Sequence, residues 1–417
     1  MKVFKFGGAS TKDAAGVRNV FSVVKNSGEK QLLIVVSAMG KMTNALEVVV
    51  NDYFETGNYK TALRNVYDFH DRILKDLFPA PDHPVFSEVQ ELFEEVHLFL
   101  TTNKSGNHAC VYDQVVSLGE LVSSKIVRRY FIENGLPAAW LDVRKCIKTD
   151  SSYRDASVNW ELTEKRILQY VDPEKITVTQ GFLGAEDTNN FTTTLGREGS
   201  DYTAAIFAYC LNAAGVTIWK DVPGVLNADP RYFSKTQLLR KISYKEAIEL
   251  AFYGASVIHP KTLQPLQRKE IPLYVKSFLE PEKEGTCVGE SVPIEPQVSC
   301  FILKKNLTLI SLSSLDFSFM MEDHIGDVFK WMHEYQMKVE LIQNSAISFS
   351  VCISDKFNNL KSLLKKLGEK FSVKWNENVT LYTIRHFEPL EVKTFRENKK
   401  VLLKQETQET VQLVVKE

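Results

Sequence analysis

The sequence predicts an α/β fold built around a mainly parallel sheet, and three features of the chain predict it. Residues 2–6 alternate apolar and polar side chains, end in two glycines and continue into a segment with apolar residues at helical spacing. This strand, glycine turn and helix form an arrangement that can cradle a phosphate. Residues 32–36 read Leu-Leu-Ile-Val-Val, a continuous apolar run that is typical of a strand covered on both faces of a parallel sheet. Three later runs, at 138–142, 176–184 and 216–219, predict further buried strands.

Composition narrows the classes of protein to which the chain can belong. Its 417 residues allow two or three domains, and its net charge of −1 leaves no basic footprint, so we expect no nucleic-acid partner. No apolar run is long enough for a signal peptide or a membrane span, so we expect no membrane association. The six cysteines are scattered without a Cys-x-x-Cys pair, which indicates thiols in a reducing cytoplasm. The histidines show no metal spacing, so no protein metal site is predicted.

A polar loop at 192–205 leads straight into an apolar helix. It reads Thr-Thr-Thr-Leu-Gly-Arg-Glu-Gly-Ser-Asp-Tyr-Thr-Ala-Ala, and three threonines with two glycines favour neither a core strand nor a helix. Apolar residues fall at helical spacing after Asp201, which places Ser200 and Asp201 in the cap region. Such a loop aims backbone N–H groups and the positive end of the helix dipole at one spot. Arg197 adds a donor fork for an anion, and the charge of Asp201 indicates a neighbouring ammonium group or metal ion.

The N-terminal turn is of the same kind, and the two turns together resemble a known family. Lys5 ends the first strand in Lys-Phe-Gly-Gly, where its ammonium can reach a cradled phosphate. The run Thr-Thr-Leu-Gly-Arg-x-Gly-Ser-Asp-Tyr-Thr-Ala resembles the aspartate kinase signature of the amino acid kinase family, and weaker flanking motifs follow in family order up to about residue 287. Without the resemblance, an ordinary capped helix and a solvated lysine at a strand edge would explain the two turns.

The resemblance implies a fold and an activity. It implies an amino acid kinase-like three-layer fold with a mainly parallel central sheet in residues 1–290, with a helical segment at about 50–130. The expected reaction transfers the γ-phosphoryl group of ATP to the side-chain carboxylate of L-aspartate and gives 4-phospho-L-aspartate, at the entry to lysine, threonine and methionine biosynthesis. Mg²⁺ would bind to the nucleotide phosphates. The alternatives are another phosphotransferase of the same fold, acting for example on glutamate, and a catalytically silent ligand-sensing regulator.

Other nucleotide-binding classes lack their motifs. The chain contains no G-x-G-x-x-G, which argues against a dehydrogenase, and no G-x-x-x-x-G-K-[ST], which excludes P-loop kinases. The chain ends after the C-terminal region, so we expect no fused dehydrogenase.

The resemblance also implies roles for individual residues. Lys5 would stabilise the transferring phosphoryl group, and Asp201 would orient Lys5. Substrate-binding roles are carried over to Ser37, Thr43, Glu120, Arg197 and Ser200. Glu120 would contact the α-ammonium group and Arg197 a carboxylate, whereas helix capping is the alternative for Ser37 and Thr43, as complementing the helix dipole is for Glu120. Nucleotide-binding roles are carried over to Gly7, Gly8, Ala9, Lys220, Asp221, Leu226, Arg231, Ser256 and Val257.

The chain departs from the family pattern at four positions. Ala9 and Lys220 stand where the family usually has threonine, and Ser256 stands where it has lysine, although Lys261 follows soon after. Glu198 replaces the usual glycine, so a positive φ at this position would strain the backbone. Lys220 is either an exposed loop charge or an ammonium group that meets the nucleotide.

A Pro- and charge-rich stretch at about 281–299 predicts a linker to a second region. Residues 300–417 resemble an ACT-like α+β regulatory region, with one full module at about 300–384 and an abbreviated second one without a convincing helix. Glu340 lies in its predicted effector turn, so the resemblance implies an amino acid effector, either lysine or threonine. Because ACT modules generally pair, it also implies a homodimer or a higher homo-oligomer.

Overall fold

The computed structural model describes residues 1–255, 258–315, 319–397 and 399–416. The chain divides into two compact units. The first comprises Met1–Val225, Leu238–Ala251 and Ser256–Pro296, and the second comprises Leu226–Gln237, Phe252–Ala255 and Gln297–Glu417. Among the described residues, no helix has both the length and the apolar character needed to cross a bilayer. The predicted sites at Ser256 and Val257 lie outside the described residues.

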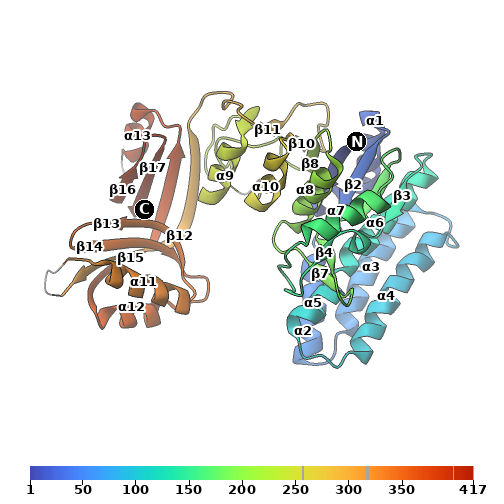
Figure 1. Cartoon of the computed structure of the whole chain (residues 1–417), viewed down its shortest axis with the longest axis horizontal. Coiled ribbons are helices and arrows are strands. Elements are labelled where there is room, and N and C mark those ends of the chain that lie inside the picture. The colour runs from blue at the N-terminus through green and yellow to red at the C-terminus, as the bar shows by residue number, and fades with distance from the viewer. Residues whose placement is uncertain (256–257, 316–318, 398, 417) are drawn as a thin grey trace. The chain divides into compact units, whose positions relative to one another are not determined.

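The first unit is built on an eight-stranded sheet (Figure 1). Its strands run in the order β3 (Ala139–Leu141), β5 (Thr177–Gln180), β2 (Leu32–Val36), β1 (Lys2–Phe6), β8 (Val216–Lys220), β10 (Leu273–Ser277), β11 (Thr286–Gly289) and β9 (Lys241–Ser243). All neighbouring pairs are parallel except β10 with β11. Every residue of β2 is buried, as its uninterrupted apolar sequence predicts.

Helices lie on both faces of this sheet and give it three layers. Helix α8 packs on β1, β2 and β8 from one side, and α6 packs on β2, β3 and β5. A helical segment lies between β2 and β3, so the chain runs through five consecutive helices before it returns to the sheet. The helices of this unit are α1 (Ala14–Ser27), α2 (Met42–Glu55), α3 (Lys60–Leu77), α4 (Pro84–Thr102), α5 (His108–Val116), α6 (Leu118–Glu133), α7 (Trp160–Tyr170), α8 (Gly199–Leu211), α9 (Tyr244–Tyr253) and α10 (Pro260–Arg268).

A small second sheet corrects the expectation that Thr192 to Thr194 form no core strand. They form β7 (Thr192–Thr194), which pairs antiparallel with β6 (Leu183–Glu186), while β4 (Lys148–Thr149) completes the sheet. All three threonines are buried. β-branched residues suit a pleated strand, and the buried hydroxyls have partners, since Thr193 Oγ1 lies 2.7 Å from Thr149 Oγ1.

The second unit contains a six-stranded antiparallel sheet. Its order is β13 (Lys338–Asn344), β14 (Ser348–Ser354), β12 (Cys300–Ser314), β15 (Phe371–Arg385), β17 (Thr410–Lys416) and β16 (Lys400–Glu406). Strands β12 and β15 are long enough to be shared by both halves of the sheet. Helices α11 (Glu322–Glu334) and α12 (Leu360–Gly368) cover one half with a core that includes Val328, Leu363 and Phe371.

Two expectations about the C-terminal part of the chain were wrong. The structure contains a helix after β15, α13 (Pro389–Arg396), and its Val392 packs with Ile384 and Leu413. This helix has eight residues with a single buried side chain, so its apolar periodicity is too weak to be read from sequence. In addition, β11 lies within the stretch predicted as a linker, where it pairs with β10 and β9.

Candidate active site

One cavity of about 550 Å³ in the first unit collects residues from distant parts of the chain. Its lining comes from the end of β1, the turn after β2, the start of α6 and the loop that leads into α8. All the predicted catalytic and substrate-binding residues line it, namely Lys5, Ser37, Thr43, Glu120, Arg197, Ser200 and Asp201. The cavity is therefore the place where the two glycine-bearing turns meet.

The register of two strands explains why two lysines meet one carboxylate. Lys5 of β1 pairs with Ile218 of β8. Side chains on a strand alternate between faces, so Lys220, two residues after Ile218, shares the face of Lys5. Asp201 lies in the first turn of α8 on that face. The Lys5 Nζ lies 2.7 Å from Asp201 Oδ1, and the Lys220 Nζ lies 3.5 Å from Asp201 Oδ2.

Asp201 is fully buried, so its charge depends on these two lysines. Burial alone would raise the pKa of Asp201, but the ammonium groups of Lys5 and Lys220 outweigh burial and hold the pKa below its ordinary value. The positive end of α8 acts in the same direction. Asp201 is therefore a permanent anion that orients the two ammonium groups, and it has no proton to exchange at neutral pH.

A close approach of two turns explains the glycine at position 8. The turn after β1 lies against the turn after β2, where the Gly40 N–H donates to the Gly8 carbonyl at 3.0 Å. A Cβ on residue 8 would lie 2.6 Å from the Gly40 oxygen and 2.7 Å from the Ala38 oxygen, which is closer than carbon and oxygen can approach. Only glycine fits, because the two turns approach too closely at this residue for any side chain.

Glu120 is a buried carboxyl group in the first turn of α6. Its Oε1 accepts a hydrogen bond from the Ala38 N–H at 3.2 Å, whereas Oε2 has no hydrogen-bond partner among the described residues. Burial raises the pKa of Glu120 to about 8, against the lowering effects of the Ala38 N–H and the Lys5 charge. The group is thus largely protonated at neutral pH and has an oxygen available for a cationic ligand.

Asp113, on α5, anchors the loop that carries Arg197, and sequence reasoning missed it. It accepts hydrogen bonds at 2.8 Å from both the backbone N–H and the hydroxyl of Thr194, and at 3.0 Å from the Arg154 N–H. Lys261 holds the same loop from another side, because its Nζ donates to the Leu195 carbonyl at 3.2 Å. The loop is therefore fixed at its base, which presents the exposed Arg197 to the cavity.

Glu198 has a left-handed backbone conformation, with φ 55° and ψ 25°. The backbone at Glu198 is therefore strained, as expected for a glutamate at a position where the family usually has glycine. We expect Glu198→Gly to raise the free energy of unfolding by about 1 kcal/mol, because glycine adopts this conformation without a steric penalty. The midpoint of urea unfolding measures the change.

Glu198→Gln is the matched control for that experiment. It removes the carboxylate but keeps a side chain on the strained backbone, so it should leave the midpoint of urea unfolding near that of the parent chain. If Glu198→Gln stabilises the protein as much as Glu198→Gly, charge repulsion and not backbone strain is the cause.

The predicted nucleotide-binding residues fall in several places. Gly7, Gly8 and Ala9 follow β1, and Lys220 ends β8 beside Asp201. Asp221 is exposed in the turn that follows. Leu226 and Arg231 belong to the second unit, where the Arg231 guanidinium pairs with Asp229 at 2.6 Å.

Outside the loop at 196–201, three residues line the cavity without having been predicted, Asn44, Glu47 and Phe182. Glu47 accepts a hydrogen bond from the Tyr112 hydroxyl at 2.9 Å. It lies one helical turn after Thr43 on α2, so the helix periodicity could have indicated it. Phe182 has a φ of 69°, and no sequence signal marks a phenylalanine for that conformation.

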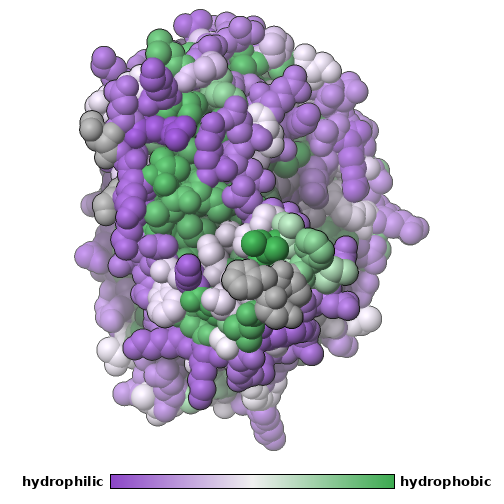
Figure 2. Space-filling view, turned by 90° about the vertical axis from the view of Figure 1, so that its left-hand side faces the viewer, coloured by the Kyte–Doolittle hydropathy of each residue, from purple (hydrophilic) through white to green (hydrophobic). Residues whose placement is uncertain are grey.

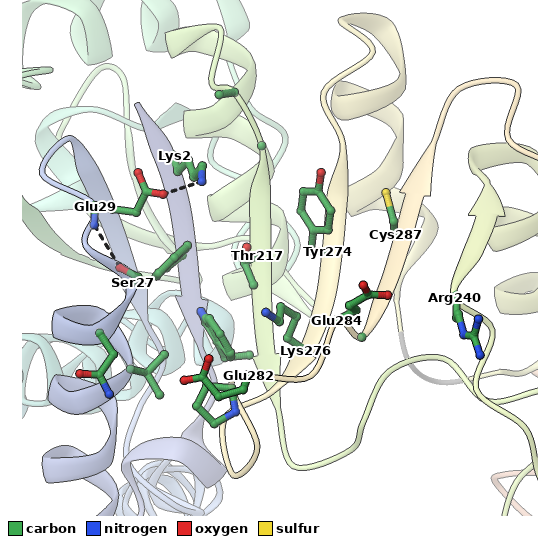
Figure 3. Close-up of a pocket in the computed structure, with 18 of the residues that line it drawn as sticks. Lys2, Ser27, Glu29, Thr217, Arg240, Tyr274, Lys276, Glu282, Glu284 and Cys287 are labelled. Atoms are coloured by element: carbon green, nitrogen blue, oxygen red, sulfur yellow. Dashed lines mark hydrogen bonds and ion pairs between the residues drawn. The ribbon is translucent and has the colours of Figure 1, made fainter.

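A larger hollow, of about 730 Å³, lies on the other face of the same strands (Figure 3). Phe4 of β1 lines it, whereas the next residue, Lys5, faces Asp201. Figure 3 shows Lys2, Thr217, Tyr274 and Lys276 along its wall, with the Lys276 ammonium 5.5 Å from the centre of the Trp219 ring. None of the predicted site residues lines this hollow, so the smaller cavity is the candidate active site.

Comparison with known proteins identifies one family and relatives within it. The model of the amino acid kinase family matches residues 1–277. The chain is 33% identical over 356 residues to the lysine-sensitive aspartokinase 3 of Escherichia coli, covering 84% of this chain and 78% of that protein. It is 29% identical to a bifunctional aspartokinase/homoserine dehydrogenase 2 of Arabidopsis thaliana over 89% of this chain, but it spans only 42% of that longer protein.

Two crystal structures of Escherichia coli aspartokinase III resemble the whole chain. One is a complex with lysine and aspartate in the T-state, with a TM-score of 0.85. The other is a complex with aspartate and ADP in the R-state, with a TM-score of 0.81. Each is 29% identical to this chain, and each match covers 100% of this chain and 96% of the other.

Proposed function

The chain belongs to the amino acid kinase family, and from this premise we propose that it is an aspartate kinase. It transfers the γ-phosphoryl group of ATP to the side-chain carboxylate of L-aspartate and releases 4-phospho-L-aspartate and ADP. The observation that carries the proposal is the single cavity lined by Lys5, Asp201, Arg197 and Glu120. The similar structure of Escherichia coli aspartokinase III in complex with aspartate and ADP supports it.

The cavity has the charges that a free acidic amino acid requires. Aspartate has two carboxylates and one ammonium group. The Arg197 guanidinium presents a planar donor fork to one carboxylate, and the free oxygen of Glu120 accepts from the ammonium group. Hydroxyls of Ser37, Thr43 and Ser200 line the remaining wall and donate to the carboxylate oxygens.

Catalysis in this cavity relies on alignment and on charge neutralisation. The attacking carboxylate is already a nucleophile, so no general base is needed. The Lys5 ammonium stabilises the negative charge of the transferring phosphoryl group. Asp201, which stays charged, holds Lys5 in place through the 2.7 Å ion pair and takes no proton.

The nucleotide binds beside the glycine turn. Its phosphates lie against the backbone of Gly7, Gly8 and Ala9, in the turn where residue 8 packs too closely on Ala38 and Gly40 to carry a side chain. Asp221, Leu226 and Arg231 remain our assignments for the sugar, base and phosphate contacts. Mg²⁺ would bind through the nucleotide phosphates. Within the described ranges, no group of three His, Cys, Asp or Glu side chains could hold a metal ion by itself.

The second unit serves as the regulatory region, with lysine as the effector. Glu340, on β13, is nearly buried and already pairs with two ammonium groups, those of Lys304 and of Lys338, the latter at 2.9 Å. The Glu340 carboxylate can therefore bind the ammonium group of a lysine ligand, which has to displace one of these two partners.

We also propose that the protein forms a homodimer or a larger homo-oligomer. The area of apolar side chains bordered by hydrophilic ones in Figure 2 is of the kind that interfaces cover.

A coupled assay of ADP release tests the function. We expect turnover with L-aspartate to exceed that with L-glutamate by about 10- to 200-fold in kcat/KM, because one methylene group is misplaced in the pocket. Added lysine should lower the turnover, and added threonine should not. Greater turnover with glutamate would favour a different phosphotransferase. Binding of lysine without any ADP release would identify a silent regulator.

A further inference from the structure

Lys261 lies just outside the active-site cavity and forms an ion pair beside it. The Lys261 Nζ lies 2.6 Å from Asp155 Oδ1, and the lysine side chain is only 32% exposed. The same ammonium group donates a hydrogen bond to the Leu195 carbonyl at 3.2 Å. Neither Lys261 nor Asp155 lines the cavity, so the pair acts on the loop that leads into α8 and not on a ligand.

The ion pair closes over the backbone immediately before Arg197. Gly196 has a φ of 78°, and a Cβ at this residue would clash with the Asp155 carboxylate. The Lys261 ammonium holds the preceding carbonyl, that of Leu195. Gly196 and Arg197 both line the cavity. The contacts of the ion pair therefore fix the two residues from which the Arg197 side chain is presented.

Helix α10 packs on α8 (Figure 1) and has a lysine near each end. Lys261 is in its first turn, and the Lys261 Nζ lies 5.5 Å from the centre of the Tyr202 ring at the start of α8. Lys269 is its C-cap residue, and the Lys269 Nζ donates to the Tyr209 carbonyl at 2.7 Å and lies 4.1 Å from the centre of the Tyr209 ring. Both lysines thus contact a backbone carbonyl and a tyrosine ring, but Tyr209 is about two helical turns further along α8 than Tyr202.

We propose that Lys261 and Asp155 are positioning residues, which hold the loop at Leu195 and Gly196 so that Arg197 can bind a carboxylate of aspartate. The inference rests on the proposed aspartate kinase activity. A partly exposed ion pair contributes little by itself, but here the ammonium group also forms a charge-assisted hydrogen bond with the loop backbone. Without this bond the loop has further conformations, and only a fraction of the molecules presents Arg197 correctly. The apparent affinity for aspartate falls in proportion to that fraction.

The first test is the kinetics of Lys261→Met with both substrates varied. We expect the KM for aspartate to rise by about 5- to 20-fold, while kcat changes less than about threefold, because saturating aspartate selects the competent loop. The KM for ATP should change less than about twofold. Lys261→Arg keeps a cation and should retain a KM for aspartate within about threefold of the parent value.

The family pattern supplies the rival role for this lysine. Ser256 stands where the family usually has a nucleotide-binding lysine, and Lys261 follows soon after. If Lys261→Met raises the KM for ATP and leaves the KM for aspartate unchanged, Lys261 serves the nucleotide and the inference is overturned.

Lys269→Met is the matched control, because it removes the same kinds of contact from the same pair of helices at the end away from the loop. It should lower the melting temperature about as much as Lys261→Met does, but leave both KM values unchanged. Asp155→Ala should also raise the KM for aspartate, and combining it with Lys261→Met should add less than about twofold, because one ion pair is lost only once. An equal rise in this KM for Lys261→Met and Lys269→Met would indicate general loosening of α8 and would overturn the inference.

Limited proteolysis with trypsin measures the loop without any substrate. Trypsin cleaves after arginine, and Arg197 is exposed, but the loop must leave its fixed conformation to enter the protease. The rate of cleavage after Arg197, followed by mass spectrometry, should rise by about fivefold in Lys261→Met and stay at the parent rate in Lys269→Met. A parent rate in both variants would show that Lys261 does not hold the loop.

The failure of this inference differs from the failure of the proposed function. If the parent chain shows no aspartate-dependent ADP release, the proposed function is wrong, while cleavage after Arg197 still tests whether Lys261 holds the loop. If the parent chain is active and Lys261→Met keeps its KM for aspartate within about twofold, only the positioning role is wrong.

Discussion

Lys5→Ala is expected to lower kcat by about 100- to 1,000-fold while the KM for aspartate and the KM for ATP change far less. The reason is that the Lys5 ammonium meets charge that develops on the phosphoryl group only as the transfer proceeds. An interaction that strengthens in the transition state appears in kcat, whereas one that is equal in both states appears in KM. Steady-state kinetics with both substrates varied provides the measurement.

Lys2→Ala is the control for Lys5→Ala. Lys2 lies on the same strand, but its ammonium pairs at the surface with Glu29 at 2.5 Å, so its loss should leave kcat unchanged. Lys5→Ala also leaves the buried Asp201 with Lys220 as its only ion-pair partner among the described residues, and Lys5→Arg restores a cation at that position. A kcat for Lys5→Ala within about threefold of the parent value would remove Lys5 from the mechanism.

Much of the site could be predicted because parallel strands bring their carboxyl ends to one edge of the sheet. Lys5 and Asp201 are far apart in sequence, but Lys5 precedes one glycine-bearing turn at that edge and Asp201 follows the other. The Lys5 Nζ therefore lies 2.7 Å from Asp201 Oδ1. The alternation of side chains likewise places Lys220 on the face of Lys5. The sequence alone leaves open whether Lys220 is an exposed loop charge. Its side chain is only 20% exposed and its Nζ lies 3.5 Å from Asp201 Oδ2, so it is not.

Other features depend on tertiary contacts that the local sequence does not contain. Thr192 to Thr194 do not form a core strand by composition, yet Asp113 and Thr149 from distant segments bond their hydroxyls and allow burial. Arg231 follows the strand that carries Lys220, but its segment packs with the second unit. Neither outcome follows from propensity or from motif order, because both depend on which distant segments pack together.

Glu120→Gln is expected to raise the KM for aspartate by about 30- to 100-fold, and to abolish the pH dependence that we expect for the parent chain. The pKa of Glu120 is raised to about 8 by burial, so the parent group loses its proton as the pH rises from 6.5 to 8.5. Only the charged form attracts the ammonium group of aspartate strongly. The KM for aspartate should therefore fall as the pH rises over this range.

The amide of Glu120→Gln does not titrate, so its KM for aspartate should stay flat between pH 6.5 and 8.5. Glu47→Gln is the matched control, because Glu47 lines the same cavity but already accepts the Tyr112 hydroxyl at 2.9 Å. It should retain the pH dependence of the parent chain. A parent KM for aspartate that does not change with pH would show that Glu120 does not contact the ammonium group.

Stability provides a second measurement of Glu120 that needs no substrate. The folded chain keeps the proton of Glu120 up to about pH 8, whereas an unfolded glutamate loses it near its ordinary pKa of 4.5. The unfolded state then binds fewer protons than the folded state, so the free energy of unfolding falls as the pH rises from about 4.5 to about 8. Glu120→Gln lacks this loss, and its melting temperature between pH 6 and pH 9 should decline by about 3 °C less than that of the parent chain. The cost in stability is therefore already present at neutral pH, and a cationic ligand that favours the charged form of Glu120 would offset it.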